Sequence, residues 1–174
     1  MQDTRYSLRV LARLIAYPDA QLRSELEALL QVLDDEDAVP ARRRAELRAL
    51  ATGLLRQDPL VVEGHYVETF DRGRATSLHL FEHVHGDSRD RGPAMIDLVQ
   101  TYEKAGLFLG PEELPDHLGV VLEFASTQPP ALAKAFLGEM AHILNAVFSA
   151  LLKRESPYAA VIAAETAAPA TDDA

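Results

Sequence analysis

The stretch that most narrows the fold and the function of this chain reads Ser77-Leu-His-Leu-Phe-Glu-His-Val-His-Gly-Asp-Ser-Arg-Asp-Arg-Gly-Pro-Ala-Met-Ile-Asp97. Ser77 suits a helix N-cap, and Gly86 suits the residue after a helix end because glycine accepts positive φ. Pro93 suits the first turn of another helix. We therefore expect a short helix from Ser77 to His85, a charged turn, and a second helix from Pro93. Leu78, Phe81 and Val84 would form one apolar stripe on the first helix.

The histidines of this stretch allow two metal interpretations. His79-Leu-Phe-Glu82-His83 matches H-x-x-E-H, in which two histidines on one helix face hold zinc and the glutamate is the base of a metal-dependent hydrolase. The expected helix is short, however, and no later segment clearly offers a third ligand. His83, His85 and Asp87 form a looser candidate set. In the simplest interpretation, His83 and His85 instead bind free carbonyl groups at the helix end.

Charged residues dominate the turn that follows. Arg89 and Arg91 alternate with Asp87 and Asp90, so the opposite charges largely neutralise each other. We expect ion pairs and caps that hold the turn in shape.

Composition excludes several classes of protein. The chain has 174 residues, no cysteine and a net charge of −10, so disulfides and thiolate chemistry are excluded and nucleic acid is not an expected partner. An acidic chain could instead attract a basic segment of a protein partner. No apolar run approaches the roughly 20 residues that span a bilayer, and the N-terminus lacks the apolar core of a signal peptide. We expect no stable membrane insertion and a cytoplasmic location.

Hydrophobic periodicity predicts helices along nearly the whole chain. The expected ranges are 4–16, 21–33, 40–55, 58–70, 77–85, 93–105, 116–126, 130–154 and 157–164. The wide apolar face of residues 130–154 predicts one long central helix. The predicted fold is an all-α, single-domain bundle of about eight or nine helices over residues 1–165, followed by a disordered tail at 166–174.

Two connections could border a binding groove. The polar linker Asp71–Thr76 contains glycine and is predicted to be mobile. The apolar loop from Leu107 to Leu114 could flank or gate such a groove.

A resemblance makes the expected function concrete. Tyr66-Val-Glu-Thr-Phe70-Asp71, the residues from Ser77 to Gly92, Ala94-Met95, Asp97-Leu98 and Tyr102 together resemble the signature of the NarJ family. These are assembly chaperones of respiratory nitrate reductase, related to the TorD and DmsD chaperones. The likeness is gapless over about forty residues. One departure is His79, where the family usually has tyrosine, so the H-x-x-E-H match depends on an atypical residue.

The resemblance implies an all-helical chaperone without catalytic residues, metal or cofactor of its own. Its expected client is the cofactor-free catalytic (alpha) subunit of respiratory nitrate reductase, including the N-terminal segment. The chaperone would keep that subunit competent for molybdenum cofactor insertion and then leave, and molybdenum cofactor biosynthesis proteins are further candidate partners. A subunit that stays in the finished complex is an alternative.

Candidate client-binding residues follow from the resemblance and from residue type. The apolar candidates are Tyr66, Phe70, Leu78, Phe81 and Val84. The polar candidates are Glu82, His83, His85, Asp87, Arg89 and Arg91. Core packing is the simpler interpretation for Tyr66 and Phe70, which lie one helical turn apart.

Overall fold

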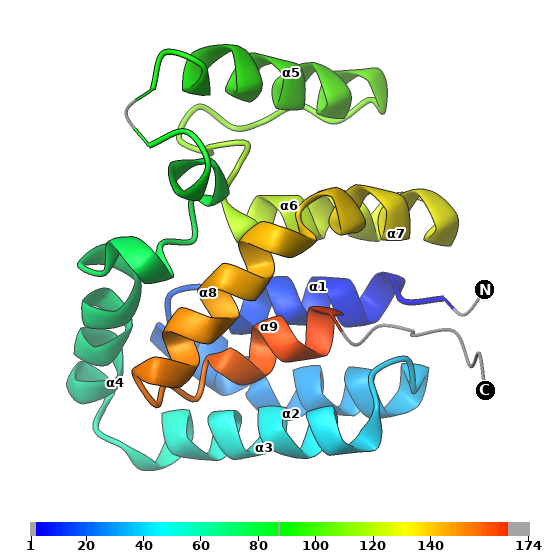
Figure 1. The fold of residues 1–174 in the computed structure, drawn as a ribbon. Helices are drawn as coiled ribbons and strands as arrows, with labels where there is room; N and C mark the ends of the chain where they lie inside the picture. Colours follow the sequence, from blue (N-terminus) through cyan, green and yellow to red (C-terminus); the bar gives the residue numbers. More distant parts are fainter. Residues whose placement is uncertain (1–2, 87, 167–174) are drawn as a thin grey trace.

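The computed structural model describes residues 3–86 and 88–166, and in these residues the chain forms nine α-helices (Figure 1). The helices are α1 (Arg5–Leu14), α2 (Ala20–Glu36), α3 (Ala41–Arg56), α4 (Pro59–Tyr66), α5 (Arg91–Lys104), α6 (Leu118–Ser126), α7 (Pro130–Glu139), α8 (Ala141–Lys153) and α9 (Ala159–Thr166). The all-α prediction is confirmed. Thr166 belongs to α9, and the remainder of the predicted tail lies outside the described residues.

Helix α1 lies at the centre of the bundle. It packs against α2, α6 and α9, and α3 closes the layer below by packing on α2 and α9 (Figure 1). Its apolar stripe is buried, with Leu11 and Leu14 among the fully enclosed side chains. Arg5 and Arg9 face solvent on the opposite side. The amphipathic pattern therefore set the orientation of this helix correctly.

The predicted start of α4 is confirmed. The Asp58 side chain accepts a hydrogen bond of 2.9 Å from the Leu60 N–H, and Pro59 occupies the first helical position. The expected helix to Phe70 is completed by a π-helical turn over Val67–Asp71.

The linker that follows was predicted to be mobile, but it is packed against the bundle. Residues Arg74–Thr76 form a 3₁₀ turn that contacts α8. Thr76 is fully buried, and its hydroxyl donates to backbone carbonyl oxygens, including that of Thr69.

The prediction of one long helix over residues 130–154 is wrong. The segment forms α7 and α8, which meet at an angle of 65°. At the junction the buried Met140 has φ −100° and ψ 2°, and its N–H bonds to the Leu137 carbonyl, three residues back, as in a tightened helix end. Gly138 lowers helix propensity immediately before this point. The bend lets α7 pack on α6 while α8 packs on α9.

No single helix in the described ranges combines the length and hydropathy needed to cross a membrane. The bent pair of α7 and α8 meets those criteria only when the two helices are taken together.

The expected helix from Ser77 to His85 is also wrong. Only Leu80–His83 forms a helical turn, of the 3₁₀ type, and His79 before it has extended backbone angles. Leu78 and Leu80 are both buried, which is the two-residue spacing of an extended segment, whereas Val84 is 50% exposed. The segment therefore takes its conformation from a partner segment rather than from its own helical pattern.

We predict that Tyr66→Phe lowers the free energy of unfolding by about 1–2 kcal/mol, because the Tyr66 hydroxyl donates a buried 2.6 Å hydrogen bond to the Ile15 carbonyl. Without the hydroxyl, that buried carbonyl loses its side-chain donor. Chemical denaturation monitored by circular dichroism measures the change. Tyr6→Phe is the matched control, since Tyr6 is 51% exposed. Equal stability of the two variants would contradict the prediction.

Candidate functional site

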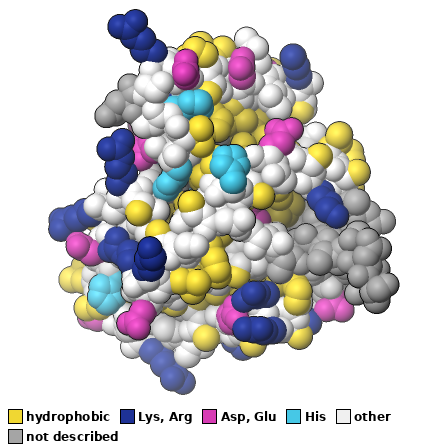
Figure 2. Space-filling model, in the orientation of Figure 1, with side chains coloured by type: hydrophobic (Ala, Val, Ile, Leu, Met, Phe, Trp, Pro, Cys, Tyr) yellow, Lys and Arg dark blue, Asp and Glu magenta, His cyan; other side chains and the backbone are white. Residues whose placement is uncertain are grey.

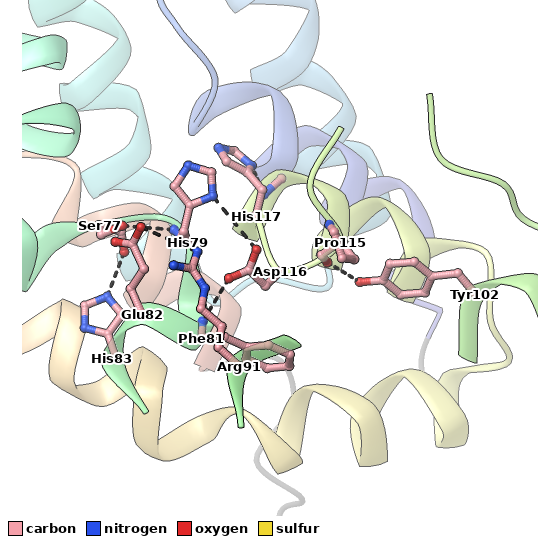
Figure 3. A network of polar contacts seen from close by, with 11 residues as sticks. Ser77, His79, Phe81, Glu82, His83, Arg91, Tyr102, Pro115, Asp116 and His117 are labelled. Carbon is pink, nitrogen blue, oxygen red and sulfur yellow. Dashed lines mark hydrogen bonds and ion pairs between the residues drawn. The ribbon is translucent and has the colours of Figure 1, made fainter. Parts of the chain in front are cut away.

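The stretch that carries the family resemblance is held by the connection that precedes α6. We call residues 77–86 the anchored segment. It forms one antiparallel bridge, between His79 and His117. Two backbone hydrogen bonds flank the bridge, from Leu80 N–H to the Asp116 carbonyl at 3.1 Å and from Leu118 N–H to the Leu78 carbonyl at 2.9 Å. Figure 3 shows the polar side chains that add to this contact.

The Asp116 carboxylate lies at the centre of the network. Its side chain is fully buried, and one oxygen accepts a 3.0 Å hydrogen bond from the Phe81 N–H. The other oxygen has no hydrogen bond and lies 3.9 Å from Nδ1 of His79, an ion-pair separation (Figure 3). Burial alone would raise the pKa of Asp116, but His79 and the Phe81 N–H outweigh burial and lower it. The carboxylate is therefore ionised inside the fold.

The pKa values of the two histidines of the bridge are shifted in opposite directions. The Asp116 carboxylate raises the pKa of His79 against the effect of burial. Burial, followed by the nearby His79, lowers the pKa of His117. Their rings stand edge to face with centroids 5.3 Å apart. The neutral His117 accepts the Gly119 N–H at 3.0 Å and so caps α6.

Helix α5 is tied to the same region at both ends. Near its C-terminus, the buried Tyr102 hydroxyl donates to the Pro115 carbonyl at 2.7 Å (Figure 3). At its start, Arg91 lies 3.7 Å from the Glu82 carboxylate. Through these contacts the anchored segment, α5 and the Pro115–Leu118 connection form one unit at the top of the bundle in Figure 1.

A groove opens beside the anchored segment, against α5 and the junction of α7 and α8. Its cavity volume is about 380 Å³. We call it the apolar groove, and its apolar lining consists of Phe81, Val84, Ala94, Leu98, Phe136, Met140 and Ile143. Asp97, Glu139, His85 and His142 add polar groups. Figure 2 shows a hollow floored by hydrophobic side chains between α5 and the α7–α8 junction.

The structure separates the candidate client-binding residues into three groups. Tyr66, Phe70 and Leu78 are buried in the core, with exposed fractions of 7%, 5% and 4%. Phe81, Val84 and His85 line the apolar groove. Glu82, His83, Arg89 and Arg91 are polar and at least partly exposed, whereas Asp87 lies outside the described residues. Client binding by all of them stays a prediction.

The expected roles of two polar candidates need correction. His83 was expected to bind a carbonyl at a helix end, but Nε2 of His83 lies 2.8 Å from the Ser77 carbonyl at the start of the segment. Because a carbonyl oxygen can only accept, the His83 Nε2–H is the donor of this hydrogen bond. His85 packs edge-on against the Phe81 ring at 5.8 Å.

The charged turn was expected to be fixed by ion pairs within itself. Arg91 instead pairs with Glu82, and Arg89 forms no ion pair with another described residue. Arg89 is exposed to solvent.

The H-x-x-E-H pattern does not form a helical metal site. His79 is extended, with φ −85° and ψ 95°, so it does not share a helix face with His83. Among the described residues, no group of three His, Asp or Glu side chains is placed to hold a metal ion. The looser set with His83 and His85 includes Asp87, which lies outside those residues.

Sequence reasoning missed Asp116, His117, Phe136 and Met140 as parts of this region. Asp116 and His117 had been assigned to the start of a helix, and no local pattern connects them with residues nearly forty positions earlier. Phe136 and Met140 were assigned to the apolar face of one long helix over residues 130–154. The break at Met140, which brings both side chains to the groove, was not predicted.

We predict that NMR titration will place the pKa of His79 above the ordinary value of 6.5 and that of His117 below it. A raised folded-state pKa gives stability that is present below about pH 6.5 and is lost as the pH rises through that pKa. Asp116→Asn should lower the pKa of His79. It should cost more stability near about pH 6 than near about pH 8.5, because the lost interaction requires the protonated His79 ring. Asp97→Asn is the control. A His79 pKa at or below 6.5 in the unmodified protein would refute the assignment.

Comparisons with known proteins give the family. A family model described as nitrate reductase delta subunit matches residues 18–164. NarJ of Escherichia coli strain K12, named nitrate reductase molybdenum cofactor assembly chaperone, is 43% identical over 152 residues, which cover 87% of this chain and 64% of that protein. This chain thus spans slightly less than two thirds of the length of that relative.

Two further proteins extend the comparison. A Bacillus subtilis strain 168 protein, described as a nitrate reductase molybdenum cofactor assembly chaperone NarJ, is 30% identical over 163 residues, with 92% of this chain and 86% of that protein covered. The crystal structure of a protein from Archaeoglobus fulgidus, described as a redox enzyme maturation protein, shares the fold with a TM-score of 0.61 at 21% identity, covering 92% of this chain and 90% of that one. With the matching family model over residues 18–164, these findings show that the chain belongs to the nitrate reductase delta subunit family.

Proposed function

We propose that this chain is an assembly chaperone that binds the cofactor-free catalytic subunit of respiratory nitrate reductase in the cytoplasm. It keeps that subunit competent for molybdenum cofactor insertion and performs no chemistry itself. The apolar groove carries the proposal, because it offers a binding surface on the stretch that bears the family resemblance. The names of the E. coli and B. subtilis relatives support the choice of client.

The groove suits the N-terminal segment of the client as an amphipathic helix. A helix can place apolar side chains at i, i+3 and i+4 into a groove of this kind. Val84 at its edge is 50% exposed, so apolar surface is available for burial. Asp97 and Glu139 lie beside the apolar lining and favour a segment with basic residues. The net charge of −10 acts in the same direction.

Release then follows from differential affinity. The chaperone binds the client while its N-terminal segment is accessible, and it binds the folded subunit less well. Cofactor insertion and folding of the client bury its N-terminal segment, so less of the client remains in the form that the chaperone binds. No energy source is needed, since the folding of the client itself lowers the concentration of the bound species.

We predict that Val84→Asp weakens binding of the client's N-terminal peptide by about tenfold or more, because a charge would be desolvated against an apolar partner. Calorimetric titration with that peptide measures the affinity, with a scrambled peptide as a specificity control. Leu60→Asp is the matched variant, since Leu60 is 78% exposed on α4 and does not line the groove. Both variants should keep the unfolding temperature. If they lose affinity equally, or neither does, the groove is not the client site.

We further predict that Arg89→Ala causes little loss of stability, because its exposed side chain forms no ion pair with another described residue. It should weaken client binding, because the free guanidinium can donate hydrogen bonds to carbonyl or carboxylate groups of the client. Phe81→Ala should lower stability, since the partly buried ring packs against the hydrophobic core. Thermal unfolding and calorimetric titration of both variants separate the two effects. Unchanged client affinity of Arg89→Ala would remove this residue from the site.

A subunit that stays in the complex is distinguished by purification. The mature membrane-bound nitrate reductase should lack this chain if it is a chaperone. Stoichiometric recovery of the chain with the mature enzyme would show the alternative role instead.

A further inference from the structure

A second cavity lies on another side of the anchored segment. It has a volume of about 420 Å³, and we call it the basic pocket. Its charged lining comprises Arg72, Arg74, Arg91 and His79, opposed by Asp71 and Glu82. Figure 2 shows basic side chains gathered along the left edge of this face, over the chain between α4 and α5.

The carboxylates near the pocket pair only loosely with Arg72 and Arg91. Arg72 pairs with Glu68 on the surface, where the two side chains are 72% and 60% exposed, and such pairs contribute little in water. Arg91 lies 3.7 Å from Glu82, beyond hydrogen-bond distance. Arg74 forms no ion pair with any residue in the described ranges. The raised pKa of His79 favours a further positive charge at the pocket wall.

Two glycines make room for arginine side chains at this place. A Cβ atom on Gly86, which has φ +52°, would lie 3.3 Å from Nη2 of Arg74. A Cβ atom on Gly73 would lie 2.5 Å from Nη1 of Arg154, whose Nη2 donates to the Glu68 carbonyl at 3.0 Å. Arg154 thereby braces the backbone that leads into the pocket, and the turn at Gly86 admits the Arg74 guanidinium beside it.

We propose that the basic pocket binds a small molecule that carries a phosphate group. Guanidinium groups present paired N–H donors that match phosphate oxygens. Three arginines around one cavity suit a group with several anionic oxygens better than a single carboxylate. The site is separate from the apolar groove, so this proposal does not rest on the proposed function.

Inorganic pyrophosphate is the probe. Calorimetric titration of the full chain at low salt should show saturable binding at one site. Arg74→Gln should weaken it by about tenfold, as expected when a charge-assisted contact to phosphate is removed. Arg48→Gln is the matched control, because Arg48 on α3 is a 49% exposed arginine that pairs with Asp34 and does not line the pocket. Binding by the control should equal that of the unmodified protein.

Three results would overturn the proposal. These are no binding of pyrophosphate, equal binding by the Arg74→Gln and unmodified proteins, and equal competition by a glutamate-rich peptide, which would indicate a surface for protein carboxylates. NMR of the unmodified protein provides a measurement that needs no variant. Pyrophosphate should shift the amide signals of Gly73 and Gly86 but not those of Gly53 and Gly138, and the reverse pattern would also contradict the pocket.

The Val84→Asp variant separates this proposal from the proposed function. It should bind pyrophosphate as well as the unmodified protein does, even though its client binding is weakened. Arg74→Gln should show the opposite pattern. Either proposal can therefore fail while the other stands.

Discussion

The buried carboxylate of Asp116 is the constraint on which the candidate site depends. Removing a carboxylate from water costs several kcal/mol unless charges or hydrogen bonds compensate for it. Here the compensation comes from the anchored segment, through the Phe81 N–H and the His79 ring. Because both partners lie on a segment with little regular structure of its own, the same interactions that stabilise the charge also fix the path of the segment.

This arrangement explains how one short segment can serve two cavities. Its backbone is fixed by the bridge to His117, so its side chains project in set directions. Phe81, Val84 and His85 line the apolar groove, whereas His79 and Glu82 line the basic pocket. A helix over the same residues would have placed Leu78, Phe81 and Val84 on one face. The extended conformation instead buries Leu78 in the core.

The parts of the fold that could be predicted from sequence are those governed by local chemistry. The stripe of α1 and the Asp58-Pro59 start of α4 depend on residues within one or two turns, and the structure has both. The anchored segment could not be predicted in this way. Its local signals, a serine N-cap and a glycine end, favour a helix, but the Asp116 backbone and side chain compete for the same N–H groups from more than thirty positions away.

The break at Met140 could not be predicted from the sequence for a related reason. Gly138 was a weak signal against a continuous apolar pattern, and the gain from packing α7 on α6 and α8 on α9 is tertiary. The break also matters for the site, since Phe136 of α7 and Ile143 of α8 reach the groove from either side of it. A straight helix would have kept one continuous face toward the core.

The histidine at position 79 has a different consequence from the one suggested by the H-x-x-E-H pattern. At position 79 the imidazole lies between the buried Asp116 and the basic pocket, and it can carry a charge that a tyrosine would not carry near neutral pH. An anion in the pocket and the Asp116 carboxylate both favour the protonated ring. Binding in the pocket and anchoring of the segment therefore favour the same charge state, and the coupling between them is reciprocal by thermodynamic linkage. Because the Phe81 N–H bonds to the same carboxylate and the Phe81 side chain lines the groove, that linkage provides a physical route from the pocket to the apolar groove.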